Sequence, residues 1–155
     1  LARIEENAKR LGIRIIDTEL LDARDVGRRF HAQADRVLVD APCSGLGVLR
    51  RKPDARWRKR EEEIAKLPQL QLDILMSAAE AVRPGGILVY STCTIERMEN
   101  EDVVEAFLDT HPEFALEMTG AYLPTKKREE TMVQLYPHVD GTDGFFIARM
   151  KRNLT

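Results

Sequence analysis

Apolar residues recur at helical spacing in three segments of the chain, and this spacing predicts three helices. Between positions 1 and 11 they recur every three or four residues, and Gly12 follows at a position where helices commonly end. The same spacing over 68–82 predicts a second helix, with Pro68 at its start, and residues 103–108 give a third. Each of these helices has one apolar face that can pack against a core.

Short runs rich in β-branched and other apolar residues, such as the contiguous Val37, Leu38 and Val39, predict strands between these segments. The runs lie at 13–16, 36–40, 87–90 and 144–150, with 114–118 as a candidate antiparallel partner for the last. Continuous runs are typical of strands that are covered on both faces of a parallel sheet. Because a helix separates the second and third runs, a right-handed connection makes these two strands parallel and brings their carboxyl ends to one edge.

Composition narrows the class of protein without identifying its function. A chain of 155 residues with 43% hydrophobic content is sized for one domain. The net charge of -2 gives no overall attraction to nucleic acid, so any basic surface must be local. Two cysteines without a Cys-x-x-Cys pair indicate a reducing, cytoplasmic setting, and scattered histidines predict no metal site. No apolar run is long enough for a membrane span.

Both cysteines follow predicted parallel strands. Cys43 comes three residues after Asp40, and Cys93 comes three residues after Tyr90. Ligands of open parallel sheets bind at this edge, so we expect the two thiols to lie close together. A single cysteine is more often a small buried apolar residue. Two cysteines at one edge are instead consistent with a nucleophile and an assisting group, or with a redox pair.

The sequence around the cysteines resembles a known family. The segments 40–47 (DAPCSGLG), 50–54 (RRKPD) and 91–94 (STCT), followed by Glu99-Asn100, are similar to signature motifs of the Nop/Sun family of RNA cytosine carbon-5 methyltransferases. The resemblance extends over nearly the whole chain. It implies an α/β, Rossmann-like class I methyltransferase fold, mostly parallel with an antiparallel C-terminal strand, and S-adenosyl-L-methionine as the methyl donor.

The resemblance also assigns roles to individual residues. Carbon 5 of cytosine is a poor nucleophile, so a thiolate first adds to carbon 6, and Cys93 is that thiolate by similarity. Cys43 is associated with product release. Asp40 lies beside the methyl donor and is expected to hold the protonated ring nitrogen of cytosine. Asp22 matches the acidic residue that contacts the adenine end of the cofactor.

A basic run follows the first cysteine motif. We expect Arg50 and Arg51 to contact RNA phosphates, and Trp57 could stack on a base. The outer members of the run, at 56–60, are as consistent with an ordinary solvated helix, because Glu61 follows at once.

The glycine-rich cofactor loop of this class is absent from the sequence, as is the acidic residue after the second strand. Both are expected to precede Leu1, so residues 1–155 would be a single, partial catalytic domain that lacks the first two strands. The strand at 13–16 would then have no neighbour to pair with. We therefore predict that the N-terminal segment is displaced, swapped or loosely packed, and that 13–16 does not pair with 37–39.

Four functions are compatible with these observations. The first is methylation of ribosomal RNA of the small subunit, and the second is methylation of transfer RNA by the same chemistry. A non-catalytic RNA-binding fragment is the third, because half of the cofactor site is missing. The fourth is a thiol redox protein that uses Cys43 and Cys93, which the absence of a Cys-x-x-Cys motif disfavours.

Overall fold

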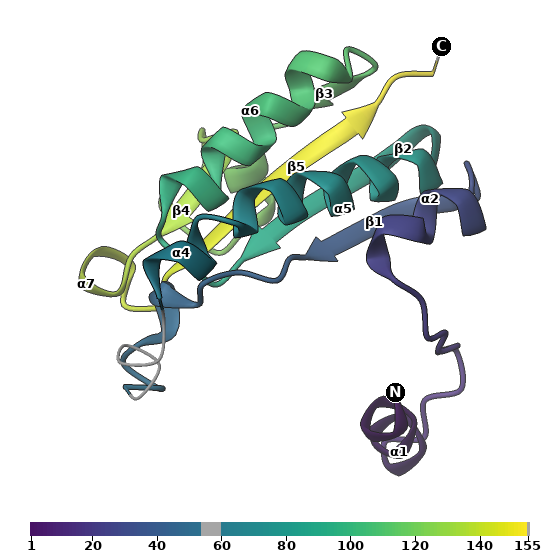
Figure 1. Ribbon diagram of the computed structural model, residues 1–155, viewed down its shortest axis with the longest axis horizontal. Helices are drawn as coiled ribbons and strands as arrows, with labels where there is room; N and C mark the ends of the chain where they lie inside the picture. Colours follow the sequence, from purple (N-terminus) through teal and green to yellow (C-terminus); the bar gives the residue numbers. More distant parts are fainter. Residues whose placement is uncertain (54–59, 155) are drawn as a thin grey trace.

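The fold is a five-stranded sheet with helices packed on one face (Figure 1). The computed structural model describes residues 1–53 and 60–154. Within them the elements are α1 (Ala2–Arg10), η1 (Ala23–Asp25), α2 (Val26–Arg29), β1 (Ala34–Asp40), η2 (Leu46–Val48), α4 (Glu61–Ile64), α5 (Leu67–Ala81), β2 (Val82–Thr92), η3 (Arg97–Glu99), α6 (Glu101–Thr110), β3 (Phe114–Leu116), η4 (Thr119–Tyr122), β4 (Met132–Leu135), α7 (Pro137–Asp140) and β5 (Phe145–Arg152).

The sheet combines one parallel pair with antiparallel strands at its C-terminal side. β1 pairs in parallel with β2, and β2 pairs antiparallel with β5. β3 and β4 both pair antiparallel with β5, at different stretches of it. The predicted parallel pair and the antiparallel partner at 114–118 are therefore confirmed. β4 was not predicted, because its four residues are too short a run to stand out from the surrounding polar loop.

The core lies between the sheet and helices α5 and α6. Paired residues of β2 and β5 are buried on the same face of the sheet. Leu88 pairs with Met150 and Tyr90 pairs with Ala148, and all four are buried. Leu75 of α5 and Phe107 of α6 cover this surface, and both are fully buried. The burial alternates along β2 and β5, so these strands are fully covered on one face.

Two expectations about the N-terminal half need correction. Residues 13–16 form no strand, and Ile15 is 92% exposed, since no neighbouring strand is there to bind its backbone. The expected displacement of this segment is confirmed: α1 buries no residue and lies away from the sheet in Figure 1. β1 is also not covered on both faces as predicted. It is an edge strand, and Leu38 is 68% exposed while Val39 packs in the core.

The buried face of β2 and the exposed outer face of β1 lead to a prediction about stability. Replacing Leu88 by Ala should lower the free energy of unfolding by about 2–5 kcal/mol, because a fully buried side chain leaves a cavity. Replacing Leu38 by Ala is the matched control, and its effect should stay within about 0.5 kcal/mol. Urea denaturation of both variants measures the difference. Equal losses would show that the outer face of β1 is covered in solution.

Candidate active site

The parallel pairing of β1 with β2 brings the two cysteine loops together. Asp40 is opposite Ser91 in the register, and the N–H of Ala41 donates to the carbonyl of Ser91 at 2.9 Å. Each loop starts at this point and reaches its cysteine within three residues. The Sγ atoms of Cys43 and Cys93 lie 3.3 Å apart, so the predicted meeting of the two thiols is confirmed.

The two thiols are inequivalent. The backbone N–H of Cys93 donates to the Sγ of Cys43 at 3.3 Å. Burial, with the hydrogen bond to Cys93 as the next cause, raises the pKa of Cys43 to about 12. Cys43 therefore keeps its proton at neutral pH and can donate it toward the Cys93 sulfur. Both cysteines are free, and their separation exceeds the roughly 2.05 Å of a disulfide.

A buried carboxylate connects the two loops. Glu99 is fully buried, and its Oε2 accepts the N–H of Ser44 at 2.8 Å. Its Oε1 accepts the hydroxyl of Thr94 at 3.3 Å, and the hydroxyls of Ser44 and Thr94 lie 2.7 Å from each other. The side chain of Gln71 in α5 donates to Oε2 at 2.9 Å. The residue after each cysteine is thus fixed to the same side chain.

Asn100 and Gln134 form a second buried connection. Asn100 accepts the hydroxyl of Thr92 at 2.6 Å and donates to the carbonyl of Thr94 at 3.2 Å. It also donates to the side chain of Gln134 at 2.8 Å, and Gln134 donates to the carbonyl of Phe145 at 3.1 Å. Strand β4, which was not predicted, therefore helps to hold the Cys93 loop through Gln134.

Glycines allow a third loop to approach the site. The N–H of Gly47 donates to the carbonyl of Cys93 at 3.0 Å, and the N–H of Gly144 donates to the carbonyl of Gly47 at 2.8 Å. A Cβ on Gly47 would lie 2.1 Å from the Gly144 carbonyl oxygen. Only glycine fits at this contact, which joins the turn before β5 to both cysteine loops.

Of the two aspartates predicted to contact the cofactor, Asp40 lines an apolar hollow and Asp22 is next in sequence to a residue that lines it. Asp40 accepts the hydroxyl of Ser91 at 3.2 Å, and it lines an apolar hollow of about 200 Å³ together with Ala23 and Val26. The hollow is completed by Val37, Leu38, Val39, Pro42, Ile74 and Ala78. Asp22 immediately precedes Ala23 and is exposed. Hydrogen bonds from Arg24 lower the pKa of Asp22 to about 2, so it is ionised at neutral pH.

Arg50 and Arg51 share an acidic partner. Arg50 pairs with Oδ1 of Asp143, and Nε of Arg51 lies 2.6 Å from Oδ2. The hydrogen bond from Arg50 holds the pKa of Asp143 below its usual range. Both guanidinium groups stay exposed at the surface. Trp57 and the basic residues 56, 58 and 59 lie outside the described residues.

Residues 1–53 and 60–154 contain neither a membrane-spanning helix nor a metal-binding cluster. No helix in these ranges is long and apolar enough to cross a membrane. No cluster of three or more histidine, cysteine or acidic side chains in them has the arrangement of a metal site.

Comparison with known proteins identifies the family. The sequence pattern of the 16S rRNA methyltransferase RsmB/F family matches residues 1–151. The chain belongs to the RsmB/F family. It is 48% identical over 154 residues to the probable ribosomal RNA small subunit methyltransferase B of Bacillus subtilis, covering 96% of this chain and 34% of that protein. The corresponding Klebsiella pneumoniae protein is 39% identical over 156 residues, covering 97% and 33%.

A solved structure shows the same fold. NSun6 from Pyrococcus horikoshii, determined with SFG, is 33% identical with a TM-score of 0.82, covering 99% of this chain and 38% of that one. The chain therefore has the Rossmann-like fold of this methyltransferase family, as the sequence predicted. It spans about a third of the length of the curated relatives it matches.

The sequence motif assigned no role to Glu99, yet its side chain is hydrogen-bonded to both cysteine loops. Replacing it by Leu should lower the free energy of unfolding by at least about 3 kcal/mol, because the N–H of Ser44 loses its acceptor and the side chains of Gln71 and Thr94 each lose one of their partners. Urea denaturation measures this loss. Glu105→Leu, which removes an exposed ion pair with Arg97, is the control and should cost less than about 1 kcal/mol. Similar losses in the two variants would contradict the assigned role of Glu99.

Proposed function

We propose that this chain takes part in S-adenosyl-L-methionine-dependent methylation of carbon 5 of a cytosine in small-subunit ribosomal RNA. The observation that carries the proposal is the 3.3 Å contact between a thiol that keeps its proton, Cys43, and a second thiol, Cys93. Membership in a family of ribosomal RNA methyltransferases supports the substrate class. The same chemistry on transfer RNA is the alternative.

In the proposed reaction Cys93 is the nucleophile. Its thiolate forms a bond to carbon 6 of cytosine, and the electron pair of the ring moves toward the ring nitrogen, which takes up a proton from solvent. We propose that Asp40, which accepts the hydroxyl of Ser91 two residues before Cys93, holds that protonated nitrogen. Carbon 5 then has enamine character, and it takes the methyl group that the cofactor supplies.

Release of the product requires three further bond changes. Carbon 5 loses its proton to a base, and the bond between carbon 6 and Cys93 breaks, returning the electron pair to sulfur. The ring nitrogen returns its proton to solvent. Cys43 is the donor nearest to that sulfur, and its hydrogen bond stabilises the departing thiolate. We therefore assign Cys43 to product release and leave the identity of the base open.

The residues around the apolar hollow suit S-adenosyl-L-methionine. An apolar hollow flanked by carboxylates can hold the adenine ring and bind the hydroxyl and ammonium groups. We propose that Asp22 lies at the adenine end and Asp40 near the sulfonium. The binding of SFG, an analogue of this cofactor, by the related NSun6 supports this choice.

Arg50 and Arg51 are the proposed phosphate contacts. Asp143 fixes one nitrogen of each guanidinium and so orients both groups. The remaining N–H donors of each side chain can meet the RNA backbone beside the cysteine loops.

The nucleophile assignment predicts opposite results for the two cysteines. Cys93→Ala should abolish the covalent adduct with RNA containing 5-fluorocytosine, because the bond to carbon 6 requires that sulfur. Cys43→Ala should instead accumulate the adduct with unmodified RNA, since release is slowed. Denaturing gel electrophoresis with labelled RNA measures both. An adduct that persists in Cys93→Ala would move the nucleophile to Cys43, and RNA binding without any adduct would favour a non-catalytic fragment.

The cofactor assignment predicts one-to-one binding of S-adenosyl-L-methionine in the micromolar range by calorimetric titration. Ala23→Trp should weaken it at least about tenfold, because the indole fills the hollow beside Asp22. Ala2→Trp on α1 is the control and should bind as the parent does. Equal affinity of the two variants would place the cofactor elsewhere, and no binding by the parent would mean that residues 1–155 do not hold the cofactor alone.

A further inference from the structure

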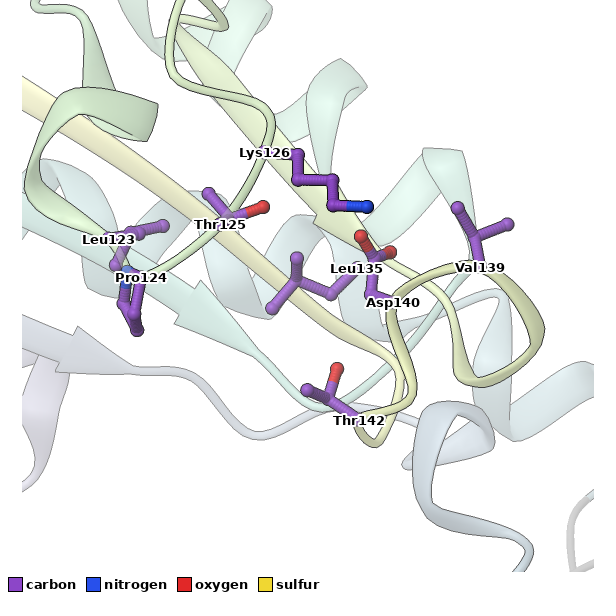
Figure 2. Close-up of a pocket in the computed structure, with 8 residues that line it drawn as sticks. All are labelled: Leu123, Pro124, Thr125, Lys126, Leu135, Val139, Asp140 and Thr142. Atoms are coloured by element: carbon purple, nitrogen blue, oxygen red, sulfur yellow. The ribbon is translucent and has the colours of Figure 1, made fainter.

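A second pocket lies on the other side of the turn that precedes β5. It has a volume of about 350 Å³, within the range of roughly 300–1,000 Å³ typical of ligand sites. Four separate pieces of chain form it: the loop 123–126, the end of β4, helix α7 and the turn at Thr142 (Figure 2). No role was assigned to it from the sequence, because these pieces come together only in the fold.

The pocket adjoins the cysteine loops through a short series of backbone contacts. Thr142 lines the pocket, and Gly144, two residues later, donates its N–H to Gly47. Gly47 in turn donates its N–H to the carbonyl of Cys93. Asp143, between Thr142 and Gly144, holds Arg50 and Arg51. One turn thus separates the pocket from the nucleophile and carries the proposed phosphate contacts.

The lining of the pocket suits a nucleobase. Leu123, Pro124, Leu135 and Val139 supply apolar surface for the faces of a ring. Polar groups stand among them: the hydroxyls of Thr125 and Thr142, the ammonium of Lys126 and the carboxylate of Asp140. Sequence-specific recognition of RNA mostly targets unstacked bases, whose faces contact side chains and whose edges accept and donate hydrogen bonds. This combination of apolar side chains with a few polar groups fits that mode.

Asp140 is fixed in a position to accept from a ligand. Its Oδ2 accepts the backbone N–H of Tyr136 at 2.8 Å and lies 3.6 Å from Nζ of Lys127. Lys127 also donates to the carbonyl of Gln134 and lies over the ring of Tyr136. These contacts hold the carboxylate in place through Oδ2, so that Oδ1 can accept an N–H from the edge of a base.

We propose that this pocket binds the base of a nucleotide next to the target cytosine, with Lys126 on the adjoining phosphate. The inference rests on the proposed function, since it takes RNA as the ligand and the nucleotide attacked by Cys93 as the reference position. The pocket would give the protein a contact with a second base of the RNA, next to the cytosine that reacts. The pocket would then hold the RNA in register and help to turn the target cytosine toward the thiols.

The test measures the affinity of this chain for short RNAs that contain one cytosine. One RNA is intact, and the others lack the base on the 5′ side or on the 3′ side of that cytosine. Removing one of these two bases should weaken binding about tenfold in the parent chain. In Val139→Trp, whose indole fills the pocket, the same removal should have no effect. Lys126→Ala should weaken binding of the intact and abasic RNAs alike.

Two controls separate the pocket from general effects of the substitutions. Leu154→Trp places the same side chain on an exposed position outside the pocket, and Lys9→Ala removes a charge on α1; both should behave as the parent does. The subsite is overturned if the parent chain binds the three RNAs with equal affinity, even if the Cys93 adduct forms. It is also overturned if removal of the base still weakens binding to Val139→Trp. If removal of the base weakens binding to the parent but not to Val139→Trp, and no Cys93 adduct forms, the result supports the subsite and contradicts the proposed chemistry.

Discussion

The arrangement of the two cysteine loops in the candidate site depends on hydrogen bonds to the buried side chain of Glu99. It accepts hydrogen bonds from the residues that directly follow Cys43 and Cys93, and from α5 through Gln71. A buried carboxyl group without hydrogen-bond partners would be costly, so Glu99 and its donors stabilise one another. Two loops from different strands are thereby kept in one arrangement, with their sulfur atoms in contact.

This arrangement gives two chemically identical side chains different properties. Cys43 is half-buried and accepts the N–H of Cys93, and its raised pKa keeps it protonated. In the proposed mechanism that proton is what makes Cys43 useful, because it stabilises the sulfur of Cys93 when the product leaves. The proposed roles, which the family resemblance implies, agree with the positions of the two sulfur atoms.

The proposed sites for the cofactor and for RNA lie on different surfaces around the two thiols. The apolar hollow beside Asp40 lies at the β1 edge, where Leu38 is exposed, and it is the proposed place for the cofactor. The turn before β5 lies on the other side, with Arg50 and Arg51 on Asp143 and the pocket of Thr142 beyond it. In this arrangement methyl donor and RNA approach the thiols from different elements.

Much of this protein was determined by the sequence itself. The apolar spacing gave α5, α6, β1, β2 and β5, because local periodicity follows directly from which face of each element is buried. The parallel pair also required Cys43 and Cys93 to meet, since parallel strands end at the same edge. The motif around these cysteines pointed to the family that the comparisons then identified.

Other features were decided only by the tertiary structure. The apolar run at 13–16 has the composition of a strand but forms none, because a strand requires a partner that local sequence does not supply. Strand β4 exists because β5 offers it an edge, and the importance of Glu99 arises from donors 28 and 55 residues away. Partners this distant leave no periodic trace along the chain, so only the folded arrangement reveals them.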